Sequence, residues 1–217
     1  MHVIIINPNA SEAMTRAMLA TARTAAPHLH IDGWTSHKGP PSIQGREDGM
    51  AAVPPLLELV RKAAADGADA VIIGCFDDTG LAEANAMVDI PVIGIGQASF
   101  HLAALKAHRF SVVTTLAVSI PIIEENIATH GFSHLSAPVR ASNVPVLELE
   151  ADPDAAHRLI IAEAQAAVDR DGATCVILGC AGMTELAAAL RNGLRVEVID
   201  AVEAAVVLTA ATLATGR

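Results

Sequence analysis

The feature of this sequence that most restricts its fold is an internal repeat. The segment Asp66-Gly-Ala-Asp-Ala-Val-Ile-Ile-Gly-Cys75 realigns with Asp171-Gly-Ala-Thr-Cys-Val-Ile-Leu-Gly-Cys180 at an offset of 105, and seven of the ten positions are identical. Two further strand-like runs have counterparts in the other half, namely 91–96 with 195–200 and 2–7 with 109–114. We therefore expect two half-chains built on the same plan.

Each half alternates short runs of Val and Ile with Ala-rich stretches of helical length. This alternation is typical of strand–helix repeats that build a mostly parallel sheet. The predicted strands lie near residues 2–7, 29–33, 70–74, 91–95, 110–114, 138–141, 175–179 and 196–199. The predicted helices lie near residues 11–25, 49–66, 79–88, 98–107, 118–130, 154–171, 183–191 and 201–214.

The expected fold class is α/β, with two pseudo-symmetric lobes that each hold a mostly parallel sheet flanked by helices. The first lobe covers 1–105 and the second 106–217, and the last helix of the first lobe could pack on the second. The helix at 201–214 is apolar on nearly every face, so we expect it to pack across the lobes or between subunits of a homo-oligomer. Ligands of such sheets bind outside the carboxyl ends of the strands. The predicted active site therefore lies in the cleft between the lobes.

Composition and charge exclude several classes of function. No apolar run reaches the roughly 18 residues of a membrane-spanning helix, and a formal net charge of -10 without a Lys or Arg cluster argues against a nucleic-acid partner. The chain enters a strand-like run at His2, which leaves no room for a signal peptide and favours the cytoplasm. The three cysteines are odd in number and lack CxxC spacing, so reduced thiols are expected.

Cys75 and Cys180 are the predicted catalytic residues, acting on a small-molecule substrate. Each ends an Ile-Ile-Gly or Ile-Leu-Gly strand and precedes a small-residue turn into a helix. Backbone N–H groups at such a turn favour a thiolate and can hold an oxyanion. Moving a proton from one face of a stereocentre to the other needs a base on one side and an acid on the other, and two thiols can do both jobs.

Two simpler interpretations of these cysteines must be weighed against this one. A lone cysteine at the end of an apolar strand is commonly buried and inert, but matched cysteines in a duplicated turn favour function. A zinc site is disfavoured because neither sulfur belongs to a CxxC pair and no His stands nearby. We therefore expect no metal at these sulfurs. Cys175, whose counterpart is Ala70, is expected to fill the core.

Four segments resemble the hydantoin racemases and the related allantoin racemases, within the larger aspartate/glutamate racemase superfamily. They are Ile6-Asn-Pro-Asn-Ala-Ser11, Gly39-Pro-Pro-Ser-Ile43, Gly74-Cys-Phe-Asp-Asp-Thr-Gly-Leu81 and Leu178-Gly-Cys-Ala-Gly-Met183. The resemblance implies two α/β lobes with the active site between them and no cofactor or metal. It also implies a two-cysteine proton transfer that interconverts D- and L-5-substituted hydantoins or allantoin.

Departures from neighbouring families narrow the choice. In glutamate and aspartate racemases, polar Asn-Thr or Thr-His pairs usually follow the two cysteines, whereas Phe76-Asp77 and Ala181-Gly182 follow them here. Arylmalonate decarboxylases typically keep only the second-half cysteine, so Cys75 argues against them. Maleate isomerisation, in which a cysteine attacks covalently, and a two-lobed small-molecule binding protein remain as alternatives.

Further residues are predicted to bind the substrate. Asn7 and Asn9 follow the first strand and could contact the ring, although Asn9 could instead cap the next helix. Thr114 and Thr115 occupy the equivalent place in the second half, with strand-end structure as the alternative. The remaining predicted substrate-binding residues are Ser42, Ile43, Phe76, Asp77, Ala181, Gly182 and Met183.

The surroundings of Cys75 allow more than one interpretation. Asp77 and Asp78 would oppose thiolate formation if their carboxylates faced Cys75, but capping of the helix that follows them is favoured. Phe76 either walls the pocket or fills the core. The Gly/Pro-rich stretch 32–49 is long for a connector and could form a movable cover that brings Ser42 and Ile43 to the substrate. Gln44 stands within it, where the resemblance would place a glutamate.

Overall fold

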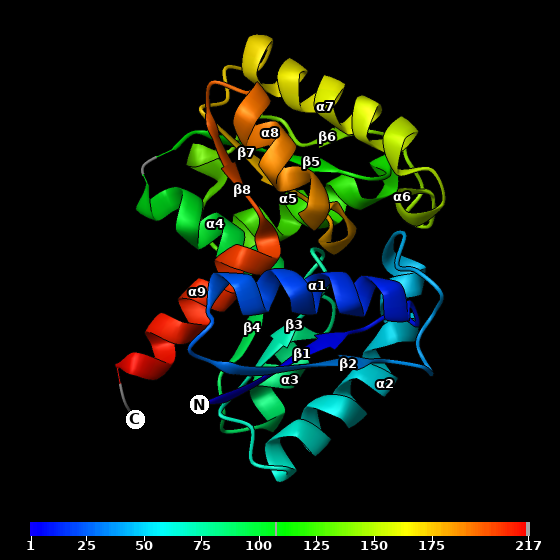
Figure 1. Cartoon of the computed structure of the whole chain (residues 1–217), viewed down its shortest axis with the longest axis vertical. Helices are drawn as coiled ribbons and strands as arrows, with labels where there is room; N and C mark the ends of the chain where they lie inside the picture. Colours follow the sequence, from blue (N-terminus) through cyan, green and yellow to red (C-terminus); the bar gives the residue numbers. More distant parts are fainter. Residues whose placement is uncertain (107, 216–217) are drawn as a thin grey trace.

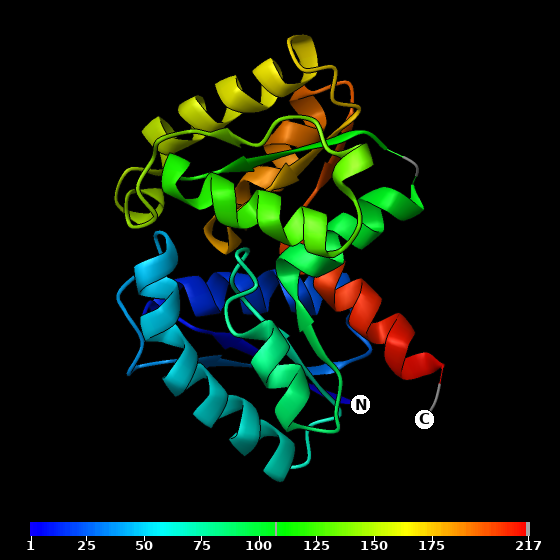
Figure 2. The same cartoon turned by 180° about the vertical axis from the view of Figure 1, so that it is seen from behind.

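The computed structural model describes residues 1–106 and 108–215, which form two four-stranded parallel sheets flanked by helices (Figures 1 and 2). The first sheet has the strand order β2-β1-β3-β4 and the second has β6-β5-β7-β8, so both are built on one plan. The strands are β1 His2–Asn7, β2 His30–Thr35, β3 Ala70–Ile73, β4 Val92–Gly94, β5 Phe110–Thr114, β6 Arg140–Ala141, β7 Cys175–Leu178 and β8 Glu197–Ile199.

The α-helices are α1 Glu12–Ala25, α2 Arg46–Ala65, α3 Leu81–Met87, α4 Ile95–Leu105, α5 Ile120–Thr129, α6 Glu148–Ala151, α7 Pro153–Asp169, α8 Ala187–Gly193 and α9 Ala201–Ala214. The 3-10 turns are η1 Ala117–Ser119, η2 Ser133–Leu135 and η3 Ala181–Leu186. Side-chain caps start three of the helices, because Ser11, Asp152 and Asp200 each accept a backbone N–H from the first turn of α1, α7 and α9. No described helix is long and apolar enough to span a bilayer.

The helix that follows each sheet packs against elements of the other half of the chain. α4 follows the first sheet and packs against α5 and α9, and its Phe100 stacks on Phe110 of β5 with ring centroids 5.9 Å apart. α9 follows the second sheet and packs against α1, α4, β3 and β4. Both views show α9, in red, lying beside the first sheet (Figures 1 and 2). This packing buries much of α9 within one chain, while Val207 of the same helix is 46% exposed.

One apolar cluster consequently runs through both halves. It joins Met18 of α1, Phe100 of α4, Phe110 of β5 and Val202 of α9, all of them buried. A separate cluster fills the far side of each sheet, one around Ile4 and the other around Val176. The shared cluster fixes the two sheets against each other, and the strand ends of both sheets thereby meet at one place.

The structure corrects several predicted boundaries. α2 begins at Arg46, earlier than predicted, and β6 is only two residues long. The predicted helix at 183–191 is divided into η3 and α8, and the short α6 was not predicted. Residue 107, the predicted end of the fourth helix, and residues 216–217, the end of the second predicted lobe, lie outside the described residues.

Candidate active site

Two Gly-Cys pairs stand at matching places, where β3 and β7 end. The N–H of Gly74 donates to the carbonyl of Ile6 at 2.8 Å, and the N–H of Gly179 donates to the carbonyl of Val113 at 2.9 Å. A Cβ at Gly74 would lie 2.6 Å from the sulfur of Met18, and one at Gly179 would come as close as 2.7 Å to a side-chain carbon of its neighbouring strand. A side chain at either strand end would therefore force its neighbours to shift, and each next residue is a half-buried cysteine.

Both cysteines open into one cavity. The cavity has a volume of about 30 Å³ for water-sized molecules, within about 390 Å³ of empty space that includes open solvent. Residues from both sheets line it, as expected from the convergence of the strand ends. The lining residues are Asn9, Met14, Ile43, Gly74, Cys75, Phe76, Asp77, Thr114, Thr115, Ser119, Val146, Gly179, Cys180 and Ala181.

Four predicted substrate-binding residues are not among those that line this cavity, namely Asn7, Ser42, Gly182 and Met183. Asn7 is fully buried, and its side-chain amide donates to Asn9 Oδ1 at 2.8 Å and to two further oxygens. It therefore holds the turn after β1. Ser42 is buried beside the cavity, and Met183 is buried in the core of the second sheet.

Gly182 acts on the site through Cys180. Its backbone N–H donates to the Cys180 thiol, which lowers the pKa of that group. A Cβ at Gly182 would lie 2.8 Å from Leu149 and 3.7 Å from the Cys180 sulfur. The glycine thus permits a tight turn against the thiol and presents no side chain to the cavity.

The polar lining comes from the ends of β1 and β5. The Asn9 amide nitrogen contacts the Met14 sulfur at 3.4 Å, and its carbonyl oxygen accepts from Ser11 N at 2.9 Å. Ser11 is the N-cap of α1, so the alternative role of Asn9 as the cap is wrong. Thr114 Oγ1 donates to the carbonyl of Gly179 at 3.3 Å, and Thr115 lines the cavity beside it.

Phe76 has both of the roles considered for it. The residue lines the cavity beside Cys75. Its ring packs edge-on against Phe100, with centroids 5.6 Å apart and an interplanar angle of 88°. It therefore connects the cavity wall to the core shared by the two sheets.

Burial raises the pKa of both thiols, and it outweighs the backbone N–H groups, which favour the thiolate as expected. Burial raises the pKa of Cys75 well above its ordinary value, and the Asp77 carboxylate raises it further. Thr79 Oγ1, which donates to the Cys75 sulfur at 3.5 Å, offsets part of this effect. Burial likewise raises the pKa of Cys180 to about 11. Desolvation outweighs the N–H donors at both sulfurs.

Asp77 faces the thiols, and Asp78 holds the loop that carries Cys75; neither side chain caps α3, so that prediction was wrong. α3 begins at Leu81 after Gly80, which carries no side-chain cap. Burial raises the pKa of Asp77 to about 6, and Ser119 Oγ donates to its carboxylate at 3.4 Å. Asp78 lies at the start of a different helix, where its carboxylate accepts N–H groups of α4.

The predicted cover is shorter than the stretch 32–49. Residues up to Thr35 belong to β2 and those from Arg46 belong to α2, which leaves 36–45 as the loop. Ile43 from this loop lines the cavity. Gln44 Oε1 accepts the backbone N–H of Val146 at 3.1 Å, which gives the loop a contact in the second half of the chain.

Sequence reasoning missed five lining residues. Gly74 and Gly179 precede the two cysteines and could have been included from the repeat itself. Met14 lies on the buried side of α1, which hydrophobic periodicity marks as core and not as cavity wall. Ser119 and Val146 stand in connections of the second half, where no motif distinguishes them.

Known proteins resemble this chain over nearly its whole length. The sequence profile of the Asp/Glu/Hydantoin racemase family matches residues 3–209. The chain belongs to this family. It is a racemase, an isomerase whose relatives imply a small-molecule substrate, and the resemblance inferred from its four motifs is confirmed.

Its relatives cover nearly the whole length of the racemase. The hydantoin racemase of Rhizobium meliloti is 42% identical over 217 residues, which are 100% of this chain and 90% of that protein. The structure of the allantoin racemase from Klebsiella pneumoniae matches with a TM-score of 0.95 at 37% identity, covering 100% of this chain and 89% of the other. The allantoin racemase from Pseudomonas fluorescens matches with a TM-score of 0.95 at 33% identity, covering 100% and 92%.

Proposed function

We propose that this racemase interconverts the D- and L-forms of 5-substituted hydantoins, allantoin among them, by proton transfer between Cys75 and Cys180 without a cofactor. One observation carries the proposal. The two halves of the repeat each deliver a Gly-Cys strand end, and both sulfurs line one small cavity. A negative charge on Cys180 also raises the pKa of Cys75, as expected of two groups that share one site.

The proposed reaction needs only the two sulfurs as proton carriers. One cysteine, as the thiolate, removes the proton from the ring carbon alpha to the carbonyl, and the C–H electron pair moves into the ring as an enolate. The opposite thiol then gives its proton to the other face of that carbon, and the electron pair returns. The first sulfur ends as a thiol and the second as a thiolate, so atoms and charge balance.

A neutral ring fits this cavity better than a carboxylate substrate. None of the described lining residues carries a positive charge, and Asp77 contributes a carboxylate beside both sulfurs. An amino acid, maleate or a malonate would meet repulsion there without a cationic partner. This charge argument disfavours the amino-acid racemase, maleate isomerase and decarboxylase alternatives.

The lining divides into a polar part and an apolar part. Asn9, Thr114 and Thr115 offer amide and hydroxyl groups that suit the carbonyl and N–H groups of a hydantoin ring. Ile43, Met14 and Val146 form apolar walls, to which we assign the substituent on the ring. The ring is held by its polar edge, and the 5-substituent is selected by the shape of the apolar walls.

The two sulfurs differ in how readily they lose a proton. Burial alone protonates both, but the Gly182 N–H favours the thiolate of Cys180, and the pKa of Cys75 lies above that of Cys180. We therefore propose that Cys180 is the more readily deprotonated of the two thiols. Activity should be highest at alkaline pH, where this thiolate forms most easily.

The expected compartment, partners and assembly of the protein can be considered in the light of the proposed chemistry. All three cysteines are free, and a thiol pair that must stay reduced suits the cytoplasm. The acidic balance of the chain disfavours nucleic acid as a partner. A homo-oligomer is still our prediction, although α9 packs within one chain, and analytical ultracentrifugation measures it.

The direct test is stereochemical. We would follow optical rotation or circular dichroism of separate L- and D-5-substituted hydantoins and of both allantoin enantiomers, with the purified chain and no added cofactor. The proposal predicts decay of each enantiomer to the racemate, and no racemisation of aspartate or glutamate. Activity on the amino acids alone would overturn the substrate assignment. Binding of hydantoins without any racemisation or exchange would instead identify a binding protein.

A further inference from the structure

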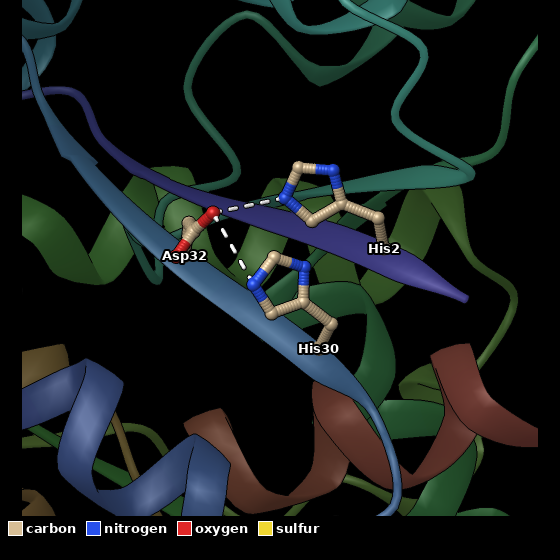
Figure 3. A group of neighbouring side chains, drawn as sticks. All are labelled: His2, His30 and Asp32. Carbon is tan, nitrogen blue, oxygen red and sulfur yellow. Dashed lines mark hydrogen bonds and ion pairs between the residues drawn. The ribbon is translucent and has the colours of Figure 1, made fainter.

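Three metal-binding side chains meet where the first sheet begins, at the end opposite the cysteines. His2 opens β1, His30 opens β2, and their Cα atoms are partners in the parallel register. Asp32 lies two residues along β2 from His30, and alternate residues of a strand share one face. The register therefore brings all three side chains to one side of the sheet edge (Figure 3).

The donor atoms of this cluster lie near one another. His2 Nε2 is 3.0 Å from Asp32 Oδ2, and His30 Nε2 is 3.9 Å from the same oxygen. A ligand atom from each of the three residues lies within 4.8 Å of the other two. Tetrahedral Zn²⁺, with bonds of about 2.0–2.2 Å, sets its ligand atoms roughly 3.3 Å apart. Small side-chain rotations would bring the three atoms to that spacing.

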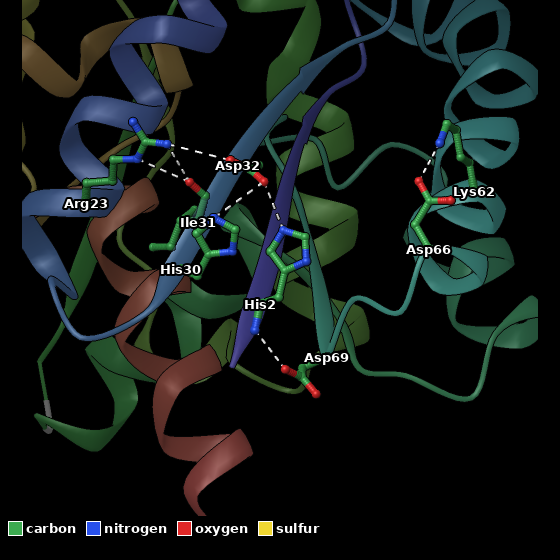
Figure 4. A network of polar contacts seen from close by, with 8 residues as sticks. All are labelled: His2, Arg23, His30, Ile31, Asp32, Lys62, Asp66 and Asp69. Carbon is green, nitrogen blue, oxygen red and sulfur yellow. Dashed lines mark hydrogen bonds and ion pairs between the residues drawn. The ribbon is translucent and has the colours of Figure 1, made fainter.

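The surrounding contacts hold the cluster in this arrangement (Figure 4). The backbone N–H of His2 donates to Asp69 at 2.7 Å, which fixes the start of β1. Arg23 from the last turn of α1 donates to the carbonyl of Ile31 and approaches Asp32 Oδ1 at 3.7 Å. The guanidinium therefore engages one carboxylate oxygen and leaves the other, Oδ2, directed at the two imidazoles.

The imidazole rings of His2 and His30 are stacked on each other. Their centroids are 4.5 Å apart with an interplanar angle of 28°, and each directs Nε2 toward Asp32 (Figure 3). The side chains are accessible, with exposed fractions of 31% for His2, 69% for His30 and 42% for Asp32. An ion could reach the cluster from solvent without any opening of the fold.

We propose that His2, His30 and Asp32 form a surface site for a divalent first-row transition ion, of which Zn²⁺ is the representative. Two imidazoles and one carboxylate suit Zn²⁺ and its neighbours, whereas Mg²⁺ and Ca²⁺ take oxygen ligands. Solvent would complete the coordination. The bound ion would join the edge strand β2 to β1, and it would raise the stability of the folded chain because it binds only that state.

The site is separate from the proposed racemase chemistry. It lies at the amino ends of the strands, and the length of β1 from His2 to Asn7 puts roughly 16 Å of strand between it and the other end of the sheet. The ion would therefore take no part in proton transfer. This inference does not rest on the proposed function, and either can fail alone.

The test compares Zn²⁺ affinity across matched variants by titration calorimetry of the reduced full chain. His30→Gln and Asp32→Asn should each weaken Zn²⁺ binding by about tenfold or more. His28→Gln, at an exposed histidine outside the cluster, should bind as the wild type does. Unchanged racemase activity in all three variants would show that they are folded.

A paramagnetic probe locates the ion and separates it from the cysteine thiols. Co²⁺ should broaden the amide resonances of Val3 and Ile31 and leave those of Gly74 and Gly179 sharp. Broadening confined to the two glycines would mean that the thiols bind the ion, and it would overturn the proposal. Equal Zn²⁺ affinity in wild type and His30→Gln, or no binding at all, would also overturn it.

Discussion

The side-chain oxygen of Gln44 accepts the backbone N–H of Val146 at 3.1 Å, and this bond joins the loop after β2 to the segment that leads into α6. The neighbouring Ile43 and Val146 itself both line the cavity. The bond therefore closes the wall of the site between two segments far apart in the sequence. Position 44 needs only a side-chain hydrogen-bond acceptor to make this bond, and a glutamate would also supply one.

Substitution of Gln44 should consequently depend on whether the acceptor is kept. Gln44→Ala should lower kcat/KM by about 3- to 10-fold, the value of one neutral hydrogen bond, mainly through KM because the walls are less well held. Gln44→Glu should stay close to wild type. Steady-state kinetics of both variants measure this, and equal losses in the two would show that the hydrogen bond is not what matters.

The Asp77 carboxylate should set the pH range of activity. Its charge raises the pKa of both thiols, so Asp77→Asn should favour the thiolate and move the rising limb of the kcat/KM profile to lower pH. Glu83→Gln removes one negative charge from the exposed start of α3 and serves as the control. If Asp77→Asn leaves the rising limb of the kcat/KM profile in place, or moves it to higher pH, the charge of Asp77 does not control the ionisation of the thiols.

Asp78 should contribute to stability through the start of α4. Its two side-chain oxygens accept from Gly96 N at 3.0 Å and Gln97 N at 2.7 Å, and Asn replaces one of these oxygens by an NH₂ group that cannot accept. Asp78→Asn should therefore lower the free energy of unfolding by about 1–3 kcal/mol. Asp89→Asn, at an exposed position, should have little effect, and chemical denaturation of both variants measures the difference.

The Asp78 carboxyl group should also make the free energy of unfolding depend on pH. Burial raises the pKa of Asp78 from 3.8 to about 8, so the folded chain binds a proton that the unfolded chain has lost. Its contribution is present below the unfolded value and is lost as pH rises through the folded one. The stability gap between wild type and Asp78→Asn should narrow across that window. A gap that widens with pH would contradict a buried protonated carboxyl.

The sequence predicted the two-sheet plan because the repeat and the alternation of Val/Ile runs with Ala-rich runs are local patterns. It placed Cys75 and Cys180 at strand ends for the same reason. It could not place Met14 or Val146 in the cavity, because those contacts depend on how α1 and a distant connection pack. The His2, His30 and Asp32 cluster was missed since strand register, not spacing along the chain, brings it together.

Activity should depend on sulfur and not on a metal. Exhaustive chelation should leave the racemisation rate unchanged, because the proposed proton carriers are both thiols and the proposed ion site lies at the other end of the sheet. Alkylation of the cysteine thiols should abolish activity. Bound substrate should slow the alkylation, because it fills the cavity. Mass mapping identifies the modified cysteine. Loss of activity on chelation, restored by added zinc, would contradict the mechanism.

In the proposed mechanism, Cys75 and Cys180 serve opposite faces of one carbon. The measurement is loss of the alpha proton in deuterated water, followed by NMR for separate L- and D-hydantoins and corrected for spontaneous exchange. Single replacement of either cysteine by Ser or Ala should abolish net racemisation, because each enantiomer needs both a base and an opposite acid.

Exchange in the single variants should be one-sided. The remaining thiol can remove a proton and return deuterium on its own face, so each variant should exchange one enantiomer slowly with retained configuration. The Cys75 and Cys180 variants should prefer opposite enantiomers. If the Cys75 variant still racemises at the wild-type rate, the two-thiol account is wrong.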